Sequence, residues 1–303
     1  MKNSVEGLTI ARFAHALVLP LKTVTVPPFT TTNTVIYGVR DFVVIDPAPS
    51  ELSAQQILLS HIDERLKEGH KFLGVFLTHH HNDHTQSASL LRDSYDVPIA
   101  AHQAAESHLS FAIDRRLLDG DKILVAEGCE LRAIYSPGHA DSHMVYYDAL
   151  SLVLIAGDMI TDRGCVLIPP GSGCLKTYLE NLQKLSVLKL KAIIPAHGKI
   201  VSENANQFLE QALRHRYQRI LSILETLKRR SSALSAYDIT LEVYRNGVND
   251  ALLPFAQLSV ESSLSWLLAN GLAEQNENYC YTACNIEEKS EALNALAKLH
   301  QSR

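Results

Sequence analysis

Residues 78–84 read THHHNDH and place four histidines and one aspartate within a single short stretch. The apolar run FLGVFL at 72–77 precedes them and predicts a buried strand, and TQSASLLRDSYD at 85–96 predicts the start of a helix. The histidines therefore follow the carboxyl end of a strand, where α/β proteins place their functional groups. Such a cluster directly after a buried strand is unusual for purely structural residues, so it indicates a metal site.

Strands and helices mix along the first two hundred residues. The patterns predict strands at 33–46 (two, joined by a turn near 38–41), 72–77, 97–102, 121–135 (two), 143–148, 151–158 and 191–197, and helices at 51–69, 86–95 and 177–190. Helices fall between only some of these strands. The pattern therefore favours an α/β architecture with mixed sheets over a purely parallel one.

The sequence changes character after Gly198. A long helix is expected over 203–230, a shorter helix within 231–246, and a further helix that stops at Gly271 and is followed by short strand-like pieces. This order is the outline of a winged-helix module. We therefore predict two domains, 1–202 and 203–303.

The bulk composition narrows the class of protein. The chain has 303 residues and a net charge of -5, which disfavours a protein that coats DNA but leaves a local basic groove open. Its five cysteines form an odd, scattered set, which does not resemble a disulfide framework. The apolar stretch at 13–21 contains His15 and Pro20 and is too short to span a bilayer. We expect a cytoplasmic protein with no membrane partner.

Within THHHNDH, the alternation of side chains sends His79 and His81 to the same side. His80 points the other way and is not expected to be a ligand. Asp83 and His84 come as the chain turns, so they can face a second metal ion nearby. Imidazole and carboxylate groups suit Zn²⁺, Fe or Mn.

Two ligands do not fill a metal site, so further ligands must come from other segments. His139 in SPGHADSH, Asp158 in LIAGDM and His197 in IIPAHG each lie on a loop after a predicted strand or turn. A lone histidine at a strand end is more often a hydrogen-bonded structural residue, and an aspartate after glycine is usually in a turn or cap. Taken in order behind THHHNDH, however, the three segments favour a ligand set assembled on a rigid scaffold.

The series THHHNDH, PGH, GD and PAHG resembles the signature of the metallo-β-lactamase superfamily, HxHxDH followed by His, Asp and His. The matching positions are His79, His81, Asp83, His84, His139, Asp158 and His197. Residues 33–48 are also similar to the opening hairpin of the family, with Asp46 at its acidic position near the floor of the site. The resemblance covers about residues 30–200 and implies an αββα sandwich with the metal ions at one edge.

The resemblance also implies roles for these residues. Two zinc ions are expected, with iron or manganese compatible with the same ligands, and His143 would either support His139 or merely pack in the core. A metal-bound hydroxide would attack the substrate, and Asp83 would orient the attacking water as well as bind metal. The implied ligands are His79, His81 and His139 for the first metal, Asp83, His84 and His197 for the second, and Asp158 as the bridge.

The segment LRHRYQRILSILE at 213–225, with the winged-helix-like end, is similar to the β-lactamase-like protein 2 subfamily. That subfamily includes a single-strand endoribonuclease and fungal thioesterases that act on carrier-protein polyketides. We expect hydrolysis of a small-molecule ester or thioester. Cleavage of single-stranded RNA is the alternative, and a non-catalytic nucleic-acid-binding regulator is a third.

The charge pattern bears on the choice between these substrates. An acidic net charge disfavours RNA, because phosphate contacts require lysine and arginine. Arg214, His215 and Arg216, with the basic run at 228–230, could form a local patch or simply a solvated surface. The sequence does not predict the oligomeric state.

Overall fold

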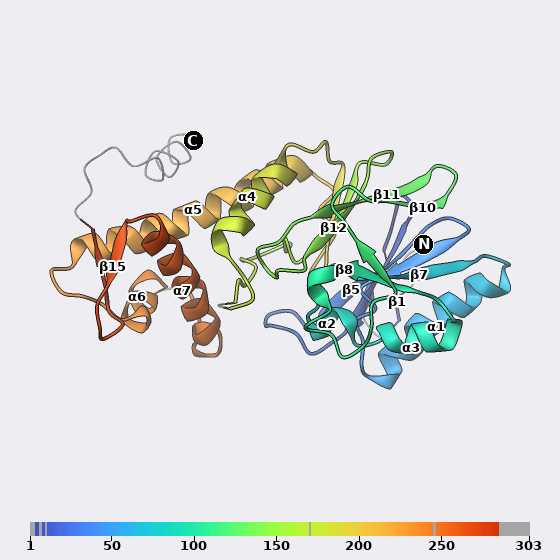
Figure 1. The fold of residues 1–303 in the computed structure, drawn as a ribbon, viewed down its shortest axis with the longest axis horizontal. Helices are drawn as coiled ribbons and strands as arrows, with labels where there is room; N and C mark the ends of the chain where they lie inside the picture. Colours follow the sequence, from blue (N-terminus) through green and yellow to red (C-terminus); the bar gives the residue numbers. More distant parts are fainter. Residues whose placement is uncertain (1–3, 6–7, 10, 170, 245–246, 285–303) are drawn as a thin grey trace. The chain divides into compact units, whose positions relative to one another are not determined.

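The computed structural model describes residues 4–5, 8–9, 11–169, 171–244 and 247–284 (Figure 1). Its internal contacts divide the chain into unit 1, Met1–Val166 with Val187–Asn206, and unit 2, Leu167–Ser186 with Gln207–Arg303. The predicted boundary after residue 202 leaves 167–186 in the first domain, whereas the structure groups this segment with unit 2. The reason is local packing: the Ser262 hydroxyl, for example, donates to the Ile168 carbonyl at 2.6 Å.

Unit 1 contains two large mixed sheets. The first has the order β3-β4-β5-β6-β7-β8-β9 and turns from antiparallel to parallel pairing between β6 and β7. The second has the order β10-β11-β12-β13-β14 and is antiparallel except for β13 and β14. The strands are β3 (Ala11–Phe13), β4 (Ala16–Lys22), β5 (Thr31–Tyr37), β6 (Phe42–Ile45), β7 (Phe72–Phe76), β8 (Ile99–His102), β9 (Arg115–Leu117), β10 (Lys122–Ala126), β11 (Cys129–Tyr135), β12 (Met144–Asp148), β13 (Val153–Gly157) and β14 (Ala192–Pro195), beside a small pair, β1 (Ser4–Val5) and β2 (Leu8–Thr9).

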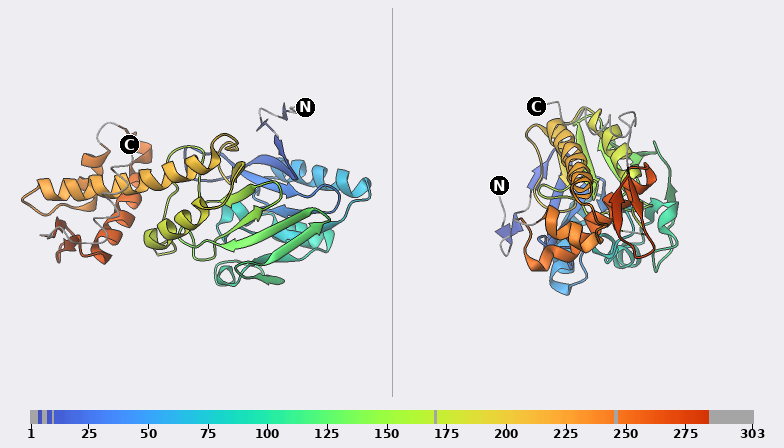
Figure 2. Two further views of the ribbon diagram at one scale, coloured as in Figure 1. Left: turned by 90° about the horizontal axis from the view of Figure 1, so that it is seen from above. Right: turned by 90° about the vertical axis from the view of Figure 1, so that its left-hand side faces the viewer.

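The two sheets enclose one apolar core, and helices cover the outer face of the first sheet. Val43 and Ile45 of β6 pack with Ile155 of β13 between the sheets. On the opposite face of β6, Val44 packs with Ile62 of helix α1 (Leu52–Lys67), in a core to which helix α3 (Ala88–Tyr95) also contributes. Each such buried aliphatic side chain stabilises the fold by about 1.5–3 kcal/mol. The predicted α/β class with mixed sheets is confirmed, and Figures 1 and 2 show its arrangement.

Strand β4 is a feature that the sequence patterns did not predict. His15 and Pro20 appeared to interrupt the apolar stretch at 13–21, yet Ala16–Lys22 pairs along its whole length with β5. Pro20 lies opposite Asn33, whose backbone N–H donates to the Ala196 carbonyl at 2.7 Å. On its other side, β4 pairs with β3 only as far as Val18. A proline is tolerated here because the pairing of β4 with its neighbours requires no backbone N–H donor at residue 20.

Unit 2 is mainly helical. It contains α4 (Leu175–Ser186), most of α5 (Ala205–Arg229), α6 (Ala236–Val243), the 3₁₀ turn η2 (Asp250–Leu252), α7 (Leu253–Ala269) and the hairpin β15 (Ala273–Gln275) with β16 (Tyr281–Ala283). Leu234 and Tyr281 exchange two backbone hydrogen bonds, which add a third short segment to the hairpin. The expected order of helices and hairpin is present, and its assignment as a winged helix stays a prediction.

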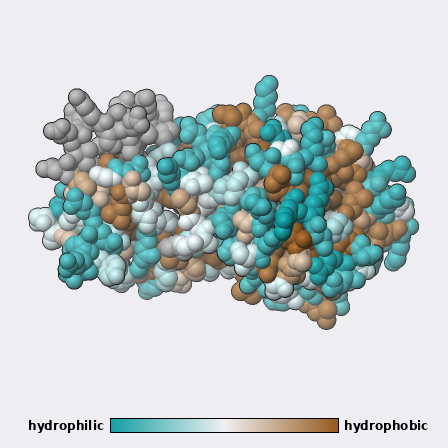
Figure 3. Space-filling view, viewed as in Figure 1, coloured by the Kyte–Doolittle hydropathy of each residue, from teal (hydrophilic) through white to brown (hydrophobic). Residues whose placement is uncertain are grey.

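The surface shows hydrophobic residues interspersed among hydrophilic ones over the face drawn in Figure 3, as is usual for globular proteins.

In the described part of the chain, each helix is either too short or too polar to cross a bilayer. None of the five cysteines forms a disulfide.

Candidate metal centre

The candidate ligands come from loops that follow strands of both sheets. Residues 79–84 follow β7 of the first sheet, and His139 lies on the loop between β11 and β12 of the second. Asp158 follows β13, and His197 follows β14. All seven candidate residues meet in one site, in groups whose donor atoms lie within 4.8 Å of one another.

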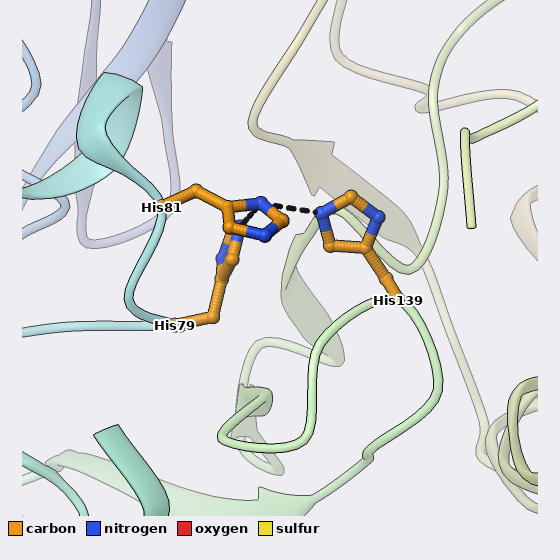
Figure 4. Close-up of side chains that lie close together, drawn as sticks. All are labelled: His79, His81 and His139. Atoms are coloured by element: carbon orange, nitrogen blue, oxygen red, sulfur yellow. Dashed lines mark hydrogen bonds between the residues drawn. The ribbon is translucent and has the colours of Figure 1, made fainter. Parts of the chain in front are cut away.

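The first group consists of His79, His81 and His139, and we call it the three-histidine group (Figure 4). His81 Nδ1 lies 2.9 Å from His79 Nε2 and 3.0 Å from His139 Nε2. Ligands of a tetrahedral zinc ion lie roughly 3.3 Å apart when each bond is about 2.0 Å long. The three ring nitrogens are therefore close to the spacing that a shared ion requires.

The second group consists of Asp83, His84 and His197, and we call it the mixed group. His197 Nε2 lies 3.5 Å from Asp83 Oδ2, and His84 Nε2 lies 3.8 Å from Asp83 Oδ1. These separations are also those expected of ligands that surround one cation.

Asp158 lies between the two groups. Its Oδ2 is 3.4 Å from His139 Nε2 of the three-histidine group and 3.7 Å from His84 Nε2 of the mixed group. Its Oδ1 is 3.4 Å from His197 Nε2. One carboxylate thus faces both groups, which is the position that the bridging role requires.

The second ring nitrogens of the histidines are held by neighbouring residues. Asp46 accepts hydrogen bonds from the Thr78 hydroxyl at 2.6 Å and the Thr78 backbone N–H at 2.7 Å, and its Oδ2 lies 2.9 Å from His84 Nδ1. The Thr78 hydroxyl in turn lies 3.0 Å from His79 Nδ1. One buried carboxylate therefore orients a histidine in each group, a type of support that fixes ligand rings and raises metal affinity.

Asn33 is a positioning residue that the sequence did not reveal. Its side-chain amide donates to the carbonyls of Pro195 and Gly198, at 2.8 and 2.9 Å, on either side of His197. The Thr31 carbonyl lies 3.0 Å from His197 Nδ1. The start of β5 thus holds the His197 loop, although nothing in a sequence links an asparagine to a histidine 164 positions later.

His143 supports the site rather than merely packing. Its Nε2 accepts a hydrogen bond at 3.0 Å from the backbone N–H of Asp158. Gly157, at a φ of +51°, lies so close that a Cβ there would be 2.7 Å from this nitrogen. Gly157 is therefore needed for the close approach of His143. The sequence alone left open whether His143 supports the site or merely packs.

The two groups differ in their electrostatics. Burial, with a smaller effect of the neighbouring imidazoles, lowers the pKa of His79 and lowers that of His81 to about 3. Burial alone would also lower the pKa of His197, but the carboxylates of Asp158 and Asp83 outweigh it and raise the value to about 10. The pKa of Asp158 is lowered because the adjacent histidines outweigh the effect of its burial.

Two buried atoms test whether these residues fit a metal ion. His84 Nε2 and Asp158 Oδ1 have no hydrogen-bond partner in the described structure. A buried polar atom left without a partner costs roughly 1–3 kcal/mol, and both atoms face the centre of the site. Nitrogen and carboxylate oxygen are ligands of divalent transition metals, so the residues fit a metal centre.

Other residues that the sequence singled out lie elsewhere. His80 points its Nδ1 at the Ser142 hydroxyl, 2.7 Å away, and belongs to neither group. Arg216 is buried in unit 2, with its guanidinium over the ring of Tyr178. Arg230 pairs with Glu242. Arg216 is thus a packing residue. This burial argues against its membership in the basic surface patch that the sequence analysis left open.

The sequence profile of the Metallo-beta-lactamase superfamily matches residues 26–197, which span every candidate ligand of the two groups. The chain belongs to this superfamily. The resemblance read from THHHNDH, PGH, GD and PAHG is therefore confirmed at the level of the family.

Curated relatives and solved structures extend this result. A lactamase-like protein of Neosartorya fischeri is 31% identical over 153 residues, which cover 50% of this chain but only 44% of the relative. An atrochrysone carboxyl ACP thioesterase of Claviceps purpurea is 25% identical over 234 residues, covering 74% of this chain and 72% of the relative. A metallo-beta-lactamase family protein of Thermus thermophilus superposes with a TM-score of 0.73 at 20% identity, covering 89% of this chain and 99% of that one. The last likeness concerns the fold alone.

Proposed function

We propose that the protein is a metal-dependent hydrolase that cleaves a thioester of a small acyl group. The observation that carries the proposal is Asp158, one carboxylate that faces both a three-histidine group and a mixed group. That arrangement fits two divalent ions, zinc by default with iron or manganese as alternatives. Such ions, when bound, supply Lewis acidity and a lowered pKa for coordinated water.

The protein residues divide the remaining work. Asp158 and the histidines of both groups hold the reacting centre in place. Asp83 lies toward the open side of the site, with 16% of its side chain exposed against none for His84. We infer that Asp83 orients the attacking water. Hydrolysis by metal-activated water requires no serine or cysteine nucleophile.

The thioester class is supported by the relatives. Proteins named as acyl-carrier-protein thioesterases align over up to 74% of this chain. Their substrate is a property of those proteins, and we infer the same bond type here rather than the same acyl group.

A direct assay tests the proposal. Metal-loaded protein is given a series of acyl-thioesters, and the released thiol is followed with a chromogenic disulfide reagent. Asp158→Asn is expected to lower kcat/KM by more than about hundredfold while its circular dichroism spectrum stays that of the wild type. His70→Ala is the matched control, because His70 also lies beside a carboxylate, that of Glu68 at 3.8 Å, outside both groups.

The same preparations are incubated with end-labelled single-stranded RNA. Thiol release by the wild type alone, with intact RNA, supports the proposal. Discrete RNA products that disappear in Asp158→Asn, without thiol release, would replace it with the endoribonuclease alternative. Turnover unchanged in Asp158→Asn would overturn the bridging role.

A further inference from the structure

A second set of side chains of the types that bind metals lies outside the centre described above. His80, His108 and Asp141 offer two imidazole nitrogens and a carboxylate oxygen within 4.8 Å of one another. We call these residues the outer cluster. None of them belongs to the three-histidine group or the mixed group, and the proposed hydrolysis makes no use of them.

The distances within the outer cluster suit ligands of one ion. The Asp141 carboxylate has Oδ2 at 3.3 Å from His108 Nε2 and Oδ1 at 3.6 Å from His80 Nδ1. The shorter distance equals the roughly 3.3 Å expected between neighbouring ligands of a tetrahedral ion with bonds of about 2.0 Å, and the longer one is slightly greater. The longer one exceeds an ordinary hydrogen bond, so His80 and Asp141 are not hydrogen-bonded to each other.

The backbone that carries the cluster is held in place. The Tyr135 hydroxyl donates to the Asp141 carbonyl at 2.7 Å, and the Tyr135 ring stacks on that of His102 at a centroid distance of 4.0 Å. His80 is 8% exposed, and the Ser142 hydroxyl lies 2.7 Å from its Nδ1. The ring of His80 and the backbone of Asp141 are therefore positioned in advance, which lowers the entropic cost of binding an ion.

Two adjustments are required. Binding through His80 Nδ1 would replace the contact of this nitrogen with the Ser142 hydroxyl. The rings of His80 and His108 are stacked, with centroids 3.9 Å apart and planes at 13°. Imidazole binds a metal along a lone pair in its own plane, so two rings that share an ion cannot stay parallel. The His108 side chain is 35% exposed and has room to turn toward the Asp141 carboxylate.

We propose that the outer cluster binds a divalent first-row transition metal ion, in addition to any ions in the main centre. Two histidines and one carboxylate form an N/O ligand set that suits zinc, with water in the remaining position. His80 lies directly between the candidate ligands His79 and His81, and Asp141 lies two residues after His139. An ion here would therefore restrain both loops that carry the three-histidine group.

The test counts metal ions rather than turnover. Full-length wild type, His108→Ala and Asp141→Asn are stripped with a chelator, checked for folding by circular dichroism, and titrated with Zn²⁺ against a fluorescent competitor. Each variant is expected to bind one equivalent fewer than the wild type, or to bind its weakest equivalent at least about tenfold less tightly. His70→Ala is the matched control and is expected to bind as the wild type does.

The outcomes separate this proposal from the proposed function. Equal numbers and affinities in wild type, His108→Ala and Asp141→Asn would overturn the outer site, whatever the substrate of the enzyme. Loss of one equivalent in both variants supports it even if thioesters are not hydrolysed. Co²⁺ provides a second readout. A variant that no longer binds Co²⁺ at the outer cluster should lack the visible absorption that this bound ion contributes in the wild type.

Discussion

The three-histidine group and the mixed group lie side by side, share Asp158, and yet differ in charge. In the former, burial and the neighbouring imidazoles lower the pKa of His79 and lower that of His81 to about 3. The latter contains a carboxylate, and His197 beside it has its pKa raised to about 10 despite burial. Carboxylate charge in the mixed group thus attracts a cation, or a proton in its place, more strongly. Two groups with similar numbers of ligands therefore need not bind a cation with equal affinity.

The largest expected effect comes from removing one histidine of each group. His139→Ala and His197→Ala should each lower thioester hydrolysis more than about hundredfold, because each removes a direct ligand. Each should also lower the bound metal by about one equivalent, measured by atomic emission after gel filtration. A full metal content in either variant would show that the altered histidine is not a ligand.

A second variant perturbs both groups at once from outside. Asp46→Asn removes the charge that orients His84 directly and His79 through Thr78. Metal affinity should fall about 10–100-fold, the usual effect of losing a residue that supports a ligand. Competitive titration with Zn²⁺ checks this. Glu51→Gln, an exposed carboxylate paired with Lys22, is the control, and equal affinities in both variants would contradict the role of Asp46.

A third variant affects the mixed group alone. Asn33→Ala leaves the Pro195 and Gly198 carbonyls without their donor, so the free energy of unfolding should fall by about 1–3 kcal/mol. The His197 loop loses its restraint, while the three-histidine group keeps its geometry. Urea denaturation with and without Zn²⁺ measures both effects. An unchanged midpoint would mean that the loop is held by other contacts.

The last effect is on stability alone and concerns a carboxylate outside both groups. Burial raises the pKa of Asp148, but hydrogen bonds from Ser151, Tyr37 and the Leu150 backbone outweigh it and lower the value. A lowered folded pKa stabilises the fold above the unfolded value of about 3.9, and this stabilisation is lost as the pH falls through the folded pKa.

Wild type should therefore exceed Asp148→Asn in unfolding free energy by about 1–3 kcal/mol at pH 7, and the difference should shrink as the pH falls below about 4. Urea denaturation of the metal-free proteins at pH values from 7 to below about 4 measures the difference. Both proteins contain the carboxylates of the metal centre, so the titration of those groups cancels in the comparison. A difference that does not depend on pH would mean that the charge of Asp148 is not involved.

Local sequence patterns predicted most of the helices and strands of unit 1. Alternation and helical spacing gave close bounds for β5, β7, β10 and α1, because each buries one face or both. β4 was missed because Pro20 reads as a strand breaker, and only the partner strands reveal that the ladder needs no donor there. The membership of α4 in unit 2 was likewise invisible, since contacts with distant segments decide it.

The sequence by itself determined the chemical character of the protein: residue types that bind metals, placed at strand ends in the order of one superfamily. Only the tertiary structure decided which donor atoms face one another, how Asn33 and Asp46 hold them, and that His80 lies beside His108 and Asp141. The physical reason is that ligand type is a property of one residue, whereas coordination depends on distances between loops that only the packing of two sheets can set.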